Sequence, residues 1–138
     1  GQLSTLELET MHQHMTDTLA GAGAKINDVR YCPHGFEEMC RCRKPAPGTL
    51  LDAAQSHDVQ LSNSWMIGDS DIDIEAGQNA GCRTAKVATT SLTGGKPQSP
   101  GSEVGSADLV ASSLLEAVRQ ILQLEETRPA IFDNASSN

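Results

Sequence analysis

Long apolar runs and basic residues are both scarce in this sequence, and each scarcity removes a class of protein. No stretch approaches the roughly 20 consecutive apolar residues of a membrane-spanning helix, and the first residues lack the basic and apolar regions of a secretory signal. Lys and Arg number 10 against 18 Asp and Glu, so the formal net charge is −8, which disfavours nucleic acids and anionic membranes as partners. We therefore expect a cytoplasmic protein with neither kind of partner.

Aromatic residues are also few, with one Trp, one Tyr and two Phe in 138 residues. The core must then be built from Leu, Ile, Val, Ala and Met, which suits a layered α/β fold. A chain of this length holds one domain with a single core. We expect this domain over residues 1–127 and a flexible tail over residues 128–138.

Hydrophobic periodicity and breaker residues predict strands that alternate with helices. A capping box formed by Ser4 and Glu7 predicts where the first helix begins. We expect helices over residues 5–20, 47–56, 72–80 and 114–124, strands over residues 26–31, 65–68, 83–87 and 108–111, and a mobile loop over residues 89–106. This alternation predicts a doubly wound, Rossmann-like parallel sheet.

Three of the four cysteines lie within eleven residues, which in a reducing compartment indicates metal binding rather than disulfides. Cys32 with His34, and Cys40 with Cys42, form two pairs at spacing i, i+2, so each pair can point the same way in extended backbone. Four N and S ligands suit a closed, structural Zn²⁺ site within a loop of residues 32–42. The alternative is three free thiols and a surface histidine.

The remaining cysteine and histidines lack partners at metal-ligand spacing. Cys82 precedes an expected strand and is interpreted as a small core residue. His12, His14 and His57 are interpreted as residues on helix surfaces.

An acidic turn follows the expected strand over residues 65–68, and ligands of open α/β sheets bind beyond the carboxyl ends of strands. Asp69 and Asp73 are four residues apart, so both carboxylates can face one point and supply the oxygen ligands that Mg²⁺ prefers. Asp71 faces elsewhere and is expected to cap the helix. The alternative is that all three aspartates only cap the helix.

Two cations adjoin the cysteine segment. Arg43 offers a guanidinium for bidentate contact with phosphate, and Lys44 offers an ammonium point charge. Fixed cations beside a magnesium site suit phosphoryl transfer, which depends on positioning and on neutralising negative charge.

The sequence resembles the haloacid-dehalogenase superfamily, and within it the zinc-containing branch of heptose-bisphosphate and histidinol-phosphate phosphatases. The resemblance rests on Cys-Pro-His at 32–34, Cys-Arg-Cys-Arg-Lys-Pro at 40–45, Pro-Gly with Leu-Leu at 47–51, Gly68-Asp69 with Asp73, and the Ala-Gly pairs at 76–77 and 80–81. It implies that Lys44 contacts the transferred phosphoryl group, Arg43 faces substrate and Asp69 binds Mg²⁺ with assistance from Asp73. Cys32, His34, Cys40 and Cys42 carry over as zinc ligands.

The sequence departs from this family at its beginning. Members start with a strand ending in an Asp-x-Asp pair that supplies the nucleophile and the acid-base group, and no such pair precedes Ser4. The resemblance therefore implies an incomplete domain that lacks the middle of its sheet. We expect it to associate with itself or with a complementing N-terminal segment.

The resemblance implies a magnesium-dependent phosphatase of a small sugar phosphate, acting through an aspartyl-phosphate. The 7-phosphate of a D-glycero-D-manno-heptose 1,7-bisphosphate is the favoured substrate. Histidinol-phosphate hydrolysis is one alternative, and an inactive zinc-binding remnant is the other. Because its own residues offer no activated nucleophile, this chain alone is expected to be inactive.

Overall fold

The structure is a computed structural model that describes residues 3–35, 37–88 and 106–129. The chain forms two compact units, residues 1–39 and 40–138. All but the last residue of the expected mobile loop, and most of the expected tail, lie outside the described residues.

The first unit consists of one helix and an extended segment. Helix α1 (Thr5–Gly21) begins at the predicted capping box, in which Ser4 Oγ accepts from Glu7 N and the Glu7 carboxylate accepts from Ser4 N. The strand predicted over residues 26–31 is wrong, since no strand is assigned there. A strand requires a partner for its backbone groups, and within the described residues none pairs with this segment.

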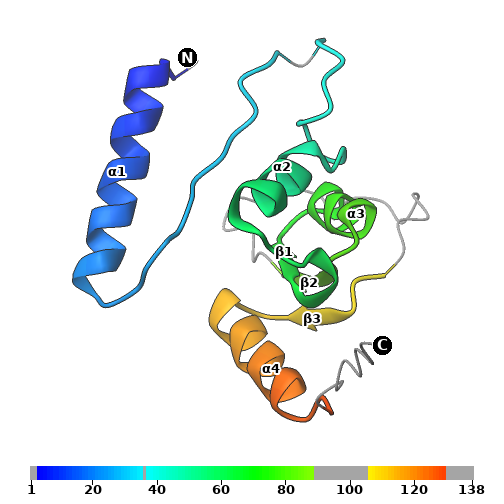
Figure 1. The fold of residues 1–138 in the computed structure, drawn as a ribbon. Helices are drawn as coiled ribbons and strands as arrows, with labels where there is room; N and C mark the ends of the chain where they lie inside the picture. Colours follow the sequence, from blue (N-terminus) through cyan, green and yellow to red (C-terminus); the bar gives the residue numbers. More distant parts are fainter. Residues whose placement is uncertain (1–2, 36, 89–105, 130–138) are drawn as a thin grey trace, which may run out of the picture. The chain divides into compact units, whose positions relative to one another are not determined.

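The second unit is an open three-stranded sheet with helices, drawn in Figure 1. Its elements in chain order are α2 (Gly48–His57), a 3₁₀ turn (Leu61–Asn63), β1 (Trp65–Gly68), α3 (Asp71–Ala80), β2 (Arg83–Val87), β3 (Leu109–Ala111) and α4 (Leu114–Glu126). The strands are parallel in the order β1-β2-β3. The predicted parallel α/β fold is confirmed.

Alternate residues of the strands face opposite sides of this sheet. On one side Ala85, Leu109 and Ala111 pack with Ala117 of α4. On the other side Met66 and Thr84, which lie opposite each other in the register, adjoin α3 at Gly77. Helices α3 and α4 therefore cover opposite faces, as expected of a doubly wound sheet.

Helix α3 lies unusually close to the sheet because its inner face is made of small residues. Ala76, Gly77 and Ala80 are all buried. A β-carbon built at Gly77 would lie 2.6 Å from Met66 Cβ and 2.8 Å from Thr84 Cγ2. The helix ends at Gly81, whose φ of 84° is the left-handed conformation that glycine adopts without strain.

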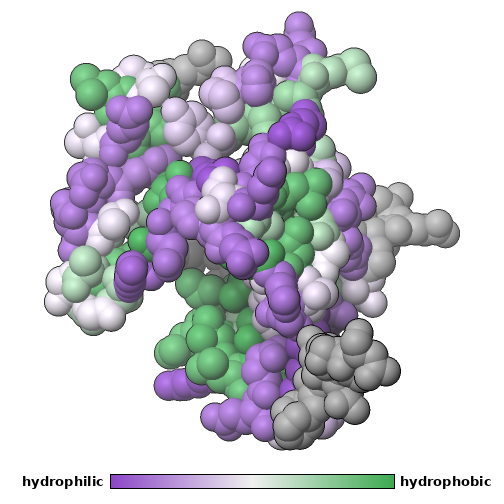
Figure 2. All heavy atoms as spheres, in the orientation of Figure 1, coloured by the Kyte–Doolittle hydropathy of each residue, from purple (hydrophilic) through white to green (hydrophobic). Residues whose placement is uncertain are grey.

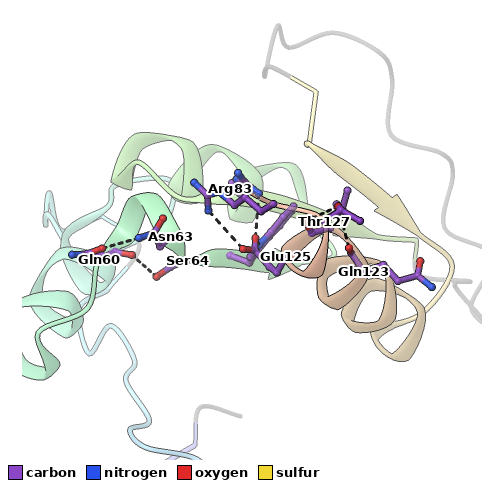
Figure 3. Close-up of polar contacts among 10 residues, drawn as sticks. Gln60, Asn63, Ser64, Arg83, Gln123, Glu125 and Thr127 are labelled. Atoms are coloured by element: carbon purple, nitrogen blue, oxygen red, sulfur yellow. Dashed lines mark hydrogen bonds and ion pairs between the residues drawn. The ribbon is translucent and has the colours of Figure 1, made fainter. Parts of the chain in front are cut away.

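A polar cluster at the beginning of the strands ties α4 to the sheet. Glu125 Oε1 accepts from Trp65 Nε1 at 3.0 Å and from Arg83 at 3.1 Å, and Figure 3 shows Arg83 and Glu125 pointing toward one another. The Arg83 guanidinium also lies 5.5 Å from the Trp65 ring centroid, within cation–π range. This end of the sheet is opposite to the end that carries the acidic turn.

Helix α4 also exposes apolar side chains on its outer surface. Leu114, Leu115 and Leu122 are each more than half exposed, and Figure 2 shows hydrophobic residues gathered over this helix. In the part of the chain that the structure describes, no helix has the length and apolarity needed to cross a membrane.

Candidate active site and metal centre

The acidic turn leads directly from the carboxyl end of β1 into α3. Ser70 is the N-cap of α3, and its hydroxyl accepts from Asp73 N at 3.4 Å. Asp73 Oδ2 in turn accepts from Ser70 N at 3.2 Å and from Ser70 Oγ at 2.6 Å. The turn and the first turn of the helix are thus joined by a capping box.

Gly68 makes room for the Asp73 side chain over the end of β1. A β-carbon built at Gly68 would lie 2.3 Å from Asp73 Cβ and 2.6 Å from Asp73 Oδ2, which is far inside van der Waals contact. The Asp73 side chain is only 6% exposed. Glycine at the strand end is therefore required for the buried position of this carboxylate.

Lys44 reaches the same carboxylate from the segment that precedes α2. Its Nζ donates to Asp73 Oδ1. Burial raises the pKa of Asp73, but the hydrogen bonds from Lys44 and Ser70 and the charge of Lys44 outweigh burial and lower this pKa. Asp73 is therefore a carboxylate at neutral pH that holds the ammonium of Lys44 at the beginning of α3.

Backbone contacts hold the segment around Lys44 in place. Gly48 N donates to Arg41 O at 2.8 Å, and Thr49 Oγ1 donates to Cys42 O at 2.8 Å. Asn79 Nδ2 of α3 donates to Pro45 O at 3.1 Å, directly beside the lysine. The position of Lys44 is thus determined by two helices and by its own ion pair.

The other predicted site residues lie in different settings. Asp69 is exposed at the carboxyl end of β1, and Arg43 is half-buried next to Lys44. Asp71 was expected to cap the helix, but Ser70 is the N-cap and Asp71 Oδ1 instead accepts from Lys86 Nζ. Sequence reasoning missed Lys86, although its place near the carboxyl end of a strand was a usable signal.

The predicted zinc ligands are brought together. The ligand atoms of Cys32, His34, Cys40 and Cys42 all lie within 4.8 Å of one another, and Cys32 Sγ is 3.6 Å from His34 Nδ1. In a tetrahedral site with metal–sulfur bonds of about 2.3 Å, ligand atoms are separated by about 3.8 Å. The cluster fits Zn²⁺ in donor type, in donor number and, after a small contraction, in spacing.

Cys82 stands apart from this cluster, as expected. It is half-buried between α3 and β2 in the chain, and burial raises the pKa of its thiol. A thiol with a raised pKa is a poor nucleophile and a poor ligand at neutral pH.

The parallel open sheet, the acidic turn after β1 and the lysine held opposite it are the features that the resemblance to haloacid-dehalogenase-like phosphatases implies. The family model described as HAD-hydrolase-like matches residues 41–117, more than half of the chain, and the chain belongs to this family.

Curated proteins similar to this chain include bacterial enzymes named D-glycero-beta-D-manno-heptose-1,7-bisphosphate 7-phosphatase. The chain is 38% identical to the one from Pseudomonas aeruginosa over 79% of its own length and 63% of that protein. It is 32% identical to the one from Escherichia coli K12 over 88% of its length and 64% of that protein. The chain thus spans less than two thirds of the length of these relatives.

A solved structure has the same fold. It is D,D-heptose 1,7-bisphosphate phosphatase from B. bronchiseptica complexed with magnesium and phosphate, which matches 88% of this chain and 66% of that chain with a TM-score of 0.73 and 31% identity. The expected superfamily and fold are confirmed.

Proposed function

We propose that this chain carries the cation and metal side of a magnesium-dependent phosphatase site. The proposed substrate is a phosphorylated heptose, with hydrolysis at the 7-phosphate of D-glycero-beta-D-manno-heptose 1,7-bisphosphate through an aspartyl-phosphate. The relatives' names favour this substrate. The observation that carries the proposal is the Lys44–Asp73 ion pair at the carboxyl end of β1, next to Asp69.

Each residue of the site then has a distinct role. Lys44 supplies a fixed ammonium for the oxygens of the transferred phosphoryl group, where it offsets negative charge as the P–O bond breaks. Arg43, next to Lys44 and half-buried, faces the substrate. The nucleophile belongs to the Asp-x-Asp pair that the resemblance implies, and the residues described in this chain act by binding and orienting.

Asp69 and Asp73 have different roles in this proposal, although the sequence pattern assigned both of them to the magnesium site. In this proposal Asp69 binds Mg²⁺, which prefers carboxylate and water ligands; its exposure after the end of β1 supports this role. Both oxygens of Asp73 already accept hydrogen bonds, from Ser70 and from Lys44. Asp73 therefore assists the metal site by orienting Lys44 and the acidic turn. Bound Mg²⁺ would supply charge neutralisation at the phosphate.

We also propose that the Cys32, His34, Cys40 and Cys42 cluster binds one structural Zn²⁺. Four protein ligands leave no position for a water or substrate, so the ion would have no catalytic role. Lys44 follows the last ligand by two residues, and Cys42 O accepts from Thr49 of α2. The zinc would therefore stabilise the backbone that delivers Lys44.

The phosphatase proposal is tested by phosphate release from heptose 1,7-bisphosphate with Mg²⁺. The chain would be assayed joined to an N-terminal segment that carries an Asp-x-Asp pair. We expect Lys44→Met to lower kcat by about 10²-fold or more, the usual effect of removing one electrostatic contact to the transition state. Lys25→Met, which removes the same charge from the other unit, controls for net charge. Full activity in Lys44→Met would refute the role.

The zinc proposal is tested by metal analysis of the purified chain. We expect one zinc per chain, lost in Cys40→Ser but retained in Cys82→Ser, because Cys82 is not part of the cluster. Native protein free of zinc would exclude the site. Zinc retained in both variants would show that the metal is held elsewhere.

A further inference from the structure

A second lysine is held at the beginning of α3. Lys86 lies one residue before the end of β2, opposite Gly68 of β1 in the register. Its ammonium donates to Asp71 Oδ1, and the side chains of Lys86 and Asp71 are 36% and 50% exposed. The carboxyl end of the sheet thus carries two lysine–aspartate pairs, each with one aspartate from the first turn of α3.

The two pairs lie on different sides of this helix. Asp71 and Asp73 are the first and third residues of α3, and residues two apart on an α-helix point about 200° apart. Lys44 comes from the segment before α2, whereas Lys86 comes from the α3 face of the sheet, since it shares the alternation of Thr84. The two ammonium groups therefore contact carboxylates that leave the first turn of α3 in different directions.

The Lys86–Asp71 pair can release its lysine to a ligand at little cost. Both partners are partly exposed, and exposed ion pairs contribute little to stability. A phosphate dianion carries more charge than the aspartate and accepts stronger, charge-assisted hydrogen bonds. Among the described residues, Lys86 is the cation of this edge that the proposed reaction leaves without a role.

We propose that Lys86 is a specificity-determining residue that binds the second phosphate of a bisphosphorylated sugar, while Lys44 binds the phosphate that reacts. This inference rests on the proposed phosphatase function. It selects, among phosphorylated sugars, those with a phosphate at each end, because only they contact both lysines. A monophosphate or an alcohol phosphate without a second anionic group uses Lys44 alone.

The test measures dissociation constants of the chain as it stands for heptose 1,7-bisphosphate and heptose 7-phosphate. Calorimetry in buffer without added magnesium prevents turnover. We expect tighter binding of the bisphosphate, and in Lys86→Met a loss of about tenfold in its affinity, as expected for one contact between charged groups. The loss for the monophosphate is expected to be clearly smaller. Lys44→Met weakens both ligands, and Lys25→Met weakens neither.

A second variant separates binding from a structural role of the ion pair. Asp71→Asn releases Lys86 but leaves its charge, so we expect the preference for the bisphosphate to be kept or increased. Loss of preference in both Asp71→Asn and Lys86→Met would show that the pair only supports the fold. If Lys86→Met behaves as Lys25→Met while Lys44→Met weakens both ligands, this inference is overturned and the phosphatase site stands. If Lys44→Met also has no effect, the proposed function itself fails.

Discussion

The carboxylate of Asp73 accepts hydrogen bonds from two neighbouring residues, Ser70 and Lys44. Oδ2 closes the capping box with Ser70, and Oδ1 holds the ammonium of Lys44. The sequence pattern assigned this residue to the metal site because of its spacing from Asp69. In the structure both of its oxygens accept hydrogen bonds from Ser70 and Lys44, which is why we propose that Asp73 contributes by positioning Lys44.

The lowered pKa of Asp73 makes a prediction about stability and pH. A carboxyl group whose pKa is lower in the folded state adds stability above its unfolded pKa of roughly 4, and this stability is lost as the pH falls through the folded pKa. We expect Asp73→Asn to be less stable at pH 6 by about 1–2 kcal/mol, the order of magnitude for weakened hydrogen bonds to a charged group. The difference should shrink at pH 3. Urea unfolding at both values measures it.

The control for this prediction is Asp69→Asn, which removes an exposed carboxylate one turn away. We expect this variant to unfold near the wild-type urea midpoint at pH 6 and at pH 3. A stability difference for Asp73→Asn that is equal at the two pH values would contradict the assigned origin of the lowered pKa.

At the scale of elements, α4 is anchored through a cluster at the opposite end of the sheet from the site. The hydrogen bond from Trp65 lowers the pKa of Glu125; burial opposes this, while the charges of Arg83 and Arg128 add to it. Three groups, from β1, from β2 and from the residues just after α4, therefore meet at one carboxylate. This anchor lies beside the only tryptophan in the sequence.

We expect Glu125→Gln to lower the melting temperature by a few degrees, because Gln retains the shape but not the charge that attracts Arg83 and Arg128. Since the pKa of Glu125 is lowered on folding, its contribution is present above the unfolded pKa and disappears in acid. Trp65 fluorescence should therefore change with acidification below pH 5 in the wild type and change less in Glu125→Gln. Glu126→Gln, on the adjacent exposed residue, is the matched control; an equal loss of stability there would remove Glu125 from this role.

At the scale of the whole molecule, the sequence predicted those parts of the fold that depend on local patterns. The strand over residues 65–68 was predicted with correct bounds because it is a short apolar run that ends in glycine. The strand over residues 83–87 was also predicted with correct bounds, between the glycine that ends α3 and the Thr/Ser/Gly-rich stretch that follows. Ser4 with Glu7 located the start of α1 for the same reason, since a capping box lies within four residues. The cluster of Cys32, His34, Cys40 and Cys42 could be predicted because all four residues lie in one short segment.

The parts that the sequence did not predict depend on partners distant in the chain. Residues 26–31 have the composition of a strand, but strand formation requires a neighbour, which no local pattern reports. The Lys86–Asp71 pair joins residues 15 apart and exists only because of the register between β1 and β2. The expected association with another copy or with a complementing segment stays a prediction.

The bare α-carbon of Gly77 has a consequence for how this site can change over evolutionary time. Because α3 rests almost directly on Met66 and Thr84, one added methyl group would raise the helix and move Asp71 and Asp73 together. Lys44 and Lys86 would both have to move to keep their ion pairs with these aspartates. Substitution of Gly77 is therefore disfavoured by geometry alone, although this residue carries no charge and is not one of the proposed site residues.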